Sequence, residues 1–199
     1  MLARRPYATR SALIVAVSFA LGATATAAIL GYQTARPHVG LSAATGDRGP
    51  AWTEIRWPFP VDLWSSGKAF KCGSANCGDD ITLFLRAKIG FCNCLSGVAD
   101  DAELDRLADI NLLGGTHSAH GPGRPITVAW MKGRSRIYAI DGTSPSGKSA
   151  VVIAFNDRCD AIVGTAIVGR DQPGAVEQAV IDFLNGDVVL KWAQVTLGL

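Results

Sequence analysis

Between residues 68 and 192, short runs of apolar and β-branched side chains recur with polar turns between them. Runs of this length and composition predict strands. The expected strands are residues 68–72, 80–90, 125–131, 135–140, 149–155, 159–168 and 188–192. Turn-forming residues at 132–134 and 156–158 join four of these strands into two predicted hairpins.

Two other segments carry apolar residues at helical spacing. Residues 100–108 begin with Asp100, a good N-cap, and Glu103 follows three positions later. Residues 174–184 follow Pro173, which favours the first turn of a helix, and they end before an Asn-Gly pair. We therefore expect an α+β domain with a mainly antiparallel sheet of about six to seven strands and two helices packed on one face.

The start of the chain has a different pattern. Residues 12–30 carry no charge and are almost wholly apolar, whereas Arg4, Arg5 and Arg10 precede them. A segment of this length can cross a bilayer as a helix, and positive charge before it favours a cytoplasmic N-terminus. The sequence thus predicts a single-pass protein of the inner (cytoplasmic) membrane, with its C-terminal domain in the periplasm or outside.

This pattern divides the chain into three parts. They are a signal-anchor or signal peptide, a flexible linker and an extracytoplasmic domain, over residues 1–32, 33–50 and 51–199. Cleavage is the alternative, because residues 23–27 contain small-residue sites; it would leave a secreted or periplasmic protein. Apolar residues resume at 28–30, beyond those sites, and this favours a retained anchor.

The net charge of +2 reflects the N-terminal segment. Four of the 19 basic residues lie within residues 1–36, which contain no acidic residue, so 15 basic and 17 acidic residues remain, a net charge of −2. No basic stripe with interleaved aromatic residues is left, and this argues against nucleic-acid binding.

Residues 142–149 match the phosphate-loop pattern G-x-x-x-x-G-K-[ST]. That loop needs a helix directly after it, whose N-terminus faces the phosphates. Here the following residues, Ala-Val-Val-Ile-Ala-Phe, are typical of a strand. We therefore interpret the motif as a hairpin connection and expect neither a bound nucleotide nor any other cofactor.

The five cysteines fit an oxidising compartment. Because their number is odd, at least one stays free, pairs between chains or binds a ligand. The disulfide candidates are Cys72, Cys77, Cys92, Cys94 and Cys159. One bond is expected to close the 72–77 turn, and another to join Cys92 or Cys94 to Cys159. The alternative is metal binding or thiol redox chemistry at Cys92-Asn93-Cys94, since residues two apart on a strand share one face.

Two histidines are the remaining metal-ligand candidates. His117 and His120 lie three residues apart in a glycine-rich loop. Such a pair needs a further carboxylate or thiolate to hold a metal, and the neighbouring sequence offers none. A polar surface loop is the preferred interpretation, with Cys92, Cys94 and this pair kept as the alternative metal site.

The aromatic segment 52–64 is stiffened by two prolines and predicts an extended strap. Its rings either close the core over the sheet or contact a protein partner or the lipid interface. The contact candidates are Trp52, Trp57, Phe59 and Trp64 in the strap, and Arg134 and Arg136 near the predicted hairpin tip.

No catalytic motif stands out along the chain. The anchor, the aromatic strap and the cysteines together favour a non-catalytic accessory or assembly subunit of a membrane protein complex. The alternative function is a periplasmic metal-binding or thiol-redox protein that uses Cys92 and Cys94.

Overall fold

The central strands carry apolar side chains on both faces, and therefore both faces of the sheet must be covered. Along β7 (Lys148–Asp157), Val151 and Ile153 belong to one buried cluster, whereas Ala150 and Val152 belong to another. The computed structural model describes residues 52–91, 93–141, 148–169 and 173–199. These residues belong to one compact unit that begins at Arg48.

One eight-stranded antiparallel sheet forms the middle layer. Its strands are β1 (Thr53–Ile55), β2 (Lys68–Cys72), β3 (Ile81–Lys88), β4 (Thr116–Ala119), β5 (Arg124–Val128), β6 (Met131–Asp141), β7 and β8 (Asp160–Gly169). Their order in space is β1-β2-β3-β8-β7-β6, and β5 and β4 pair with successive parts of β6. Strand β3 therefore pairs with β8, the last strand of the chain, although the two are far apart in the sequence.

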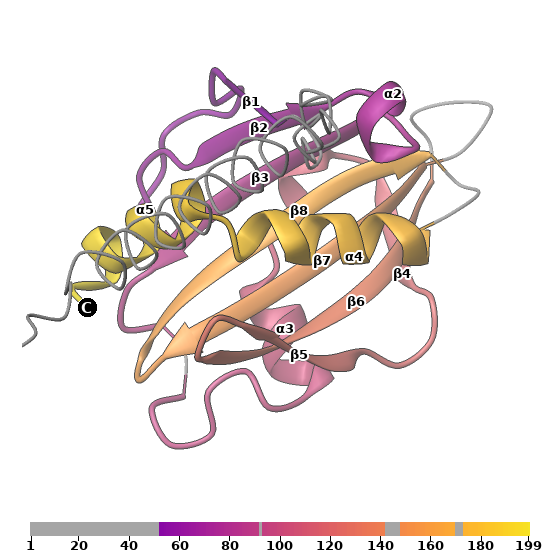
Figure 1. Ribbon diagram of the computed structural model, residues 1–199. Coiled ribbons are helices and arrows are strands. Elements are labelled where there is room, and N and C mark those ends of the chain that lie inside the picture. The colour runs from indigo at the N-terminus through magenta and orange to yellow at the C-terminus, as the bar shows by residue number, and fades with distance from the viewer. Residues whose placement is uncertain (1–51, 92, 142–147, 170–172) are drawn as a thin grey trace, which may run out of the picture. The chain divides into compact units, whose positions relative to one another are not determined.

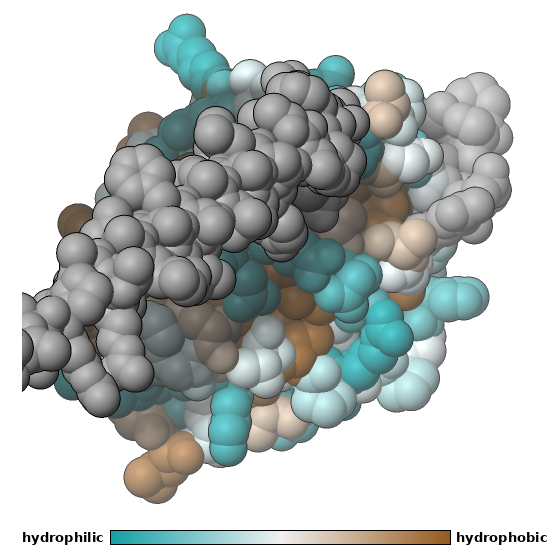
Figure 2. Space-filling model, in the orientation of Figure 1, coloured by the Kyte–Doolittle hydropathy of each residue, from teal (hydrophilic) through white to brown (hydrophobic). Residues whose placement is uncertain are grey.

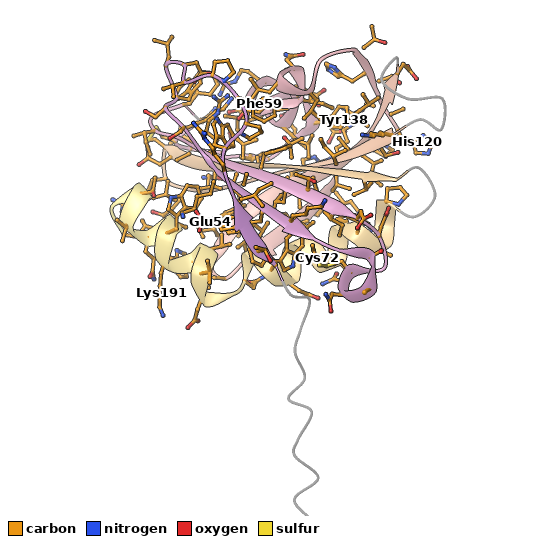
Figure 3. All side chains as sticks on the ribbon, turned by 90° about the horizontal axis from the view of Figure 1, so that it is seen from above. Glu54, Phe59, Cys72, His120, Tyr138 and Lys191 are labelled. Carbon is orange, nitrogen blue, oxygen red and sulfur yellow. A yellow bond between two sulfur atoms is a disulfide. The ribbon has the colours of Figure 1, made fainter. Side chains whose placement is uncertain are left out.

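Helices lie on both faces of this sheet (Figure 1). They are α2 (Ser74–Cys77), α3 (Asp101–Leu107), α4 (Pro173–Leu184) and α5 (Asp187–Leu197), with a 3-10 turn at Ile110–Leu113. The larger core cluster packs β3, β7 and β8 against α4 and α5. The smaller cluster packs the other face against α3 and the 3-10 turn. Figure 3 shows Lys191 of α5 and Tyr138 of β6 on opposite sides of the sheet.

The α+β class and the mainly antiparallel sheet are confirmed, as are both predicted helices. The Asp100 side chain accepts a hydrogen bond from the Glu103 N–H at 2.8 Å, and Leu104 and Leu107 of α3 are fully buried. The expectation that the helices share one face is wrong. The apolar positions of β7 that point away from α4 also need a cover, and α3 provides it.

The strand expected at 188–192 is wrong, because this segment belongs to α5. Val189, Ala193 and Leu197 are its buried residues, at the four-residue spacing of one helix face. A run of only five mostly apolar residues has no periodicity that separates a strand from a buried helix. Packing against the larger core cluster decides the outcome.

The turn expected at 132–134 is also misplaced. Strand β6 runs through these residues, and the hairpin turns at Ala129 and Trp130 instead. Ala129 has a φ of 52°, and its N–H donates to the Asn185 Oδ1 at 2.7 Å. Gly133 lies inside the strand. A Cβ at this position would come within 2.2 Å of the Ala154 carbonyl oxygen, so the close approach of β7 requires glycine here.

Two short edge strands, β1 and β4, were not expected; they bring the sheet to eight strands. The predicted N-terminal segment 1–32 and linker 33–50 lie outside the described residues. Among the helices that the structure describes, none combines the length and apolar composition needed to span a bilayer.

Two substitutions test the helical face of α5. Ala193 is fully buried and Val195 is 84% exposed, although residues two apart would share a face in a strand. We expect Ala193→Asp to lower the free energy of unfolding by at least about 3 kcal/mol, because it buries an unpaired carboxylate. Val195→Asp should lower it by less than about 0.5 kcal/mol. Urea denaturation followed by tryptophan fluorescence measures both, and equal losses would contradict the helix.

Candidate functional site

The aromatic strap, residues 52–64, turns its rings onto the domain. Trp52 stacks on Phe183 of α4 with ring centroids 4.5 Å apart. Beyond the β1 edge, Phe59 packs on Phe84 of β3 at 4.8 Å, and Trp57 contacts both of these rings. In Figure 3, Phe59 lies on the side of the sheet opposite α4 and α5. The strap therefore wraps around the edge strands and anchors itself by its aromatic residues.

A cluster of charges lies beneath the second half of the strap. Arg86 of β3 donates from Nε and Nη2 to the two carboxylate oxygens of Asp109, at 2.8 and 2.5 Å. Its Nη1 donates to Asp62 of the strap at 2.7 Å. Lys88 Nζ lies 2.9 Å from the same Asp109, and only 4% of the Arg86 side chain and 6% of the Lys88 side chain are exposed. Two cations thus meet two carboxylates, and the cluster carries no net charge.

Aromatic rings cover the lysine of this cluster. Lys88 Nζ lies 5.5 Å from the ring centroid of Trp64 and 5.6 Å from that of Phe91. The two rings meet edge to face at 4.6 Å. Because a ring face attracts a cation, this arrangement holds the strap against the residues that follow β3.

The strap ends in a tight turn over residues 62–65. The Asp62 carbonyl accepts from the Ser65 N–H at 3.0 Å, and Asp62 Oδ1 accepts from the Trp64 N–H at 2.8 Å. The hydrogen bond from Arg86 holds the pKa of Asp62 below its ordinary value, with a further contribution from the Trp64 N–H. Since its neighbours fix the turn, Leu63 points outward and is 100% exposed.

A second braced turn follows β3. Asn93 Oδ1 accepts from the N–H groups of Leu95 and Ser96, at 3.0 and 3.4 Å. A disulfide joins Cys94 to Cys159 at the turn between β7 and β8. Within this loop Leu95 is 99% exposed.

We call residues 62–65, Ile89 and residues 93–97 the loop platform. The two leucines at its tips are almost fully exposed, and Ile89, directly after β3, is 53% exposed. Figure 1 places the end of β3 and the β7–β8 turn at the same end of the sheet, and Figure 2 shows a hydrophobic side chain projecting there. Three exposed apolar side chains therefore lie in or beside firmly held turns at this end of the domain.

A depression of about 360 Å³ opens beside the platform. Loop residues directly after Leu95 form part of its wall, and β5, β6 and the end of β7 form the rest. Its lining is mostly uncharged: Ser96, Val98, Ala99, Pro125, Ile126, Thr127, Lys132, Gly133 and Asn156. Trp130, at the turn that joins β5 to β6, is 52% exposed.

Four of the predicted cysteines form two disulfides, Cys72–Cys77 and Cys94–Cys159. The first closes the short helix α2, and the second braces the platform. Cys92 lies outside the described residues. The alternative metal or redox site needs a free thiolate at Cys94, whose sulfur is bonded to Cys159 in this structure.

The predicted histidines and phosphate-loop motif have no role in the platform. His117 lies on the exposed edge strand β4, and His120 follows this strand. Within the part of the chain that the structure describes, no three metal-ligand side chains cluster. Residues 142–147 lie outside that part, and Lys148 and Ser149 of the motif begin strand β7 rather than a helix.

The two candidate arginines bind α3. Arg134 pairs with Asp101, and Arg136 Nη1 lies 3.0 Å from Asp105. Tyr138 also donates its hydroxyl to Asp105, and burial and then this bond raise the pKa of the tyrosine. These side chains fasten β6 to the helix.

Sequence reasoning missed the leucines of the platform and the charges beneath it. A lone leucine between turn-forming residues, as in Asp62-Leu-Trp-Ser and Cys94-Leu-Ser-Gly, is the only local signal of an exposed apolar tip. Nothing local indicates that Arg86 pairs with Asp109, because the two lie 23 residues apart. Comparison with protein-family models, curated proteins and solved structures returns no match.

The buried charge cluster makes a strong prediction for Arg86. We expect Arg86→Met to lower the free energy of unfolding by about 3 kcal/mol, because it leaves Asp109, whose side chain is 10% exposed, without its main partner. As a control, Lys68→Met breaks an exposed pair with Glu54 and should cost less than about 1 kcal/mol. A loss for Arg86→Met no larger than for the control would contradict the cluster's role.

The lowered pKa of Asp62 predicts acid sensitivity. A carboxyl whose pKa is lower in the folded state binds its proton first in the unfolded state. Its stabilising effect is therefore present at pH values above the ordinary pKa near 3.8. It is lost as the pH falls through the pKa of the folded state. The free energy of unfolding should fall as the pH drops below about 4, and less steeply in Asp62→Asn. Urea titrations at several pH values measure the slope, with Asp187→Asn on α5 as the exposed control; identical slopes for the wild type and Asp62→Asn would refute the linkage.

Proposed function

We propose that the chain is a membrane-anchored, extracytoplasmic accessory or assembly subunit of a membrane protein complex, without a catalytic role of its own. The depression beside the loop platform, together with the exposed Trp130, supports this proposal best. Trp130 lies in the turn between β5 and β6, two of the strands that line the depression, and tryptophan is enriched in the hot spots of protein interfaces.

The position of the depression fits a partner held in the same membrane. Ser96 lines the depression and directly follows Leu95, one tip of the platform. A protein that reaches the depression therefore also approaches the apolar end of the domain. An accessory subunit needs a surface of this kind, which binds a partner protein and carries no catalytic groups.

The disulfides support the proposed location outside the cytoplasm. Cys94 and Cys159 are 65 residues apart, and closing a loop of this length stabilises a fold by about 4 kcal/mol in the chain-entropy account. Disulfides of this kind persist in oxidising compartments. The Cys94–Cys159 disulfide therefore fits the side of the membrane on which the anchor is expected to place the domain.

Purification of the full chain from its native membrane in mild detergent tests this function. A stoichiometric membrane protein should copurify, and Trp130→Ser should lower its recovery at least about tenfold, as the loss of a hot-spot residue does. Val195→Ser is the matched control, because Val195 is also exposed but lies on α5, which lines no part of the depression. Recovery of the wild-type chain as a monomer, or equal recovery of the partner with both variants, would overturn the proposal.

A further inference from the structure

We propose that the loop platform enters the lipid bilayer, with Leu63 and Leu95 reaching below the headgroups of the outer leaflet. This inference deepens the proposed function and rests on its membrane anchor. It assigns the platform to lipid and leaves the depression to the protein partner.

The chemistry of the platform fits hydrocarbon better than it fits a protein surface. Its exposed apolar side chains are Leu63, Ile89 and Leu95, and all three are aliphatic. The aromatic rings of the strap pack on the domain instead. Hot spots of protein interfaces are enriched in tryptophan, tyrosine and arginine, and leucine is under-represented there. Leucine and isoleucine are among the residues that transfer most favourably into a bilayer.

The shape of the platform leads to the same conclusion. Leu63 and Leu95 are 100% and 99% exposed, so they stand out from the surface as separate tips. A protein partner would need two matching pockets for them, whereas acyl chains close around any apolar shape. Each tip is held by hydrogen bonds within its own turn, so little conformational freedom is lost on insertion.

The charges behind the tips are arranged to tolerate a medium of low dielectric constant. Arg86 and Lys88 are matched by Asp62 and Asp109, and the cluster is neutral as a whole. Asp160, at the start of β8, accepts a hydrogen bond from the Gly90 N–H at 2.6 Å, and this satisfies the backbone directly after Ile89. The cations and carboxylates of the Arg86 cluster therefore compensate one another as the platform approaches lipid.

The anchor makes weak insertion sufficient. Full burial of one leucine raises a partition constant roughly 10- to 100-fold, so two partly buried tips alone bind a membrane weakly. A flexible linker of about 18 residues, as expected over residues 33–50, has a root-mean-square end-to-end distance of roughly 25 Å. The bilayer is then present at an effective concentration in the millimolar range, and weak affinity holds the domain down.

Photocrosslinking of the full chain in phosphatidylcholine vesicles tests the inference without a partner present. A photoreactive aliphatic amino acid replaces Leu63, Leu95 or, as the control, Val195, which is 84% exposed on the opposite face. We expect lipid adducts at positions 63 and 95 to exceed those at position 195 at least tenfold. Equal yields at all three positions would overturn the inference.

A double variant separates this inference from the proposed function. Leu63→Ser with Leu95→Ser should lower lipid adducts at position 89 at least tenfold and leave recovery of the copurifying partner unchanged. If the double variant loses the partner and position 89 keeps its lipid adducts, the platform is a protein contact and the lipid assignment is wrong. If Trp130→Ser has no effect on the partner while lipid adducts form at 63 and 95, the depression is not the docking site, and the lipid inference stands.

Discussion

Burial of the Arg86 guanidinium determines how the face of the sheet opposite α4 and α5 is covered. The alternation of β3 places Phe84, Arg86 and Lys88 on the side away from α4 and α5, under the strap. A cation there is tolerated only when carboxylates reach it, and two segments supply them. Asp109 comes from the residues after α3, and Asp62 comes from the strap. The same pairs that neutralise Arg86 therefore fix both segments on the sheet.

The display of Leu63 follows from this constraint. Asp62 uses one carboxylate oxygen for Arg86 and the other for the Trp64 N–H, so the turn is held from below and from within. Trp64 then packs on Phe91, and the residue between these two fixed side chains has nowhere to go but outward.

Much of the fold is encoded in local sequence. Asp100 and Glu103 mark the start of α3, Pro173 marks that of α4, and the apolar runs of β7 and β8 are long enough to identify strands. The C-terminal run 188–192 is too short for this, and only its packing shows that it is helical. For the candidate site, the strap and the disulfides could be predicted, because aromatic residues, prolines and cysteines have strong local preferences. The exposure of Leu63 and Leu95 could not, because it depends on partners such as Asp109 and Cys159, far along the chain.

The rigidity of the platform also favours lipid over a protein partner as the medium that surrounds Leu63 and Leu95. A surface that adapts to many protein shapes is built from flexible loops or methionines, whereas this one is fixed by a disulfide, ion pairs and turn hydrogen bonds. Fixed tips set an orientation: with Leu63 and Leu95 in the bilayer, the depression, which Ser96 helps to line, lies next to one of the two inserted tips. In the arrangement that we propose, the domain presents the depression to a membrane partner in a restricted orientation. On our proposal, the stiffness of the platform favours partner binding through orientation, because less rotational freedom is lost than by a loosely tethered domain.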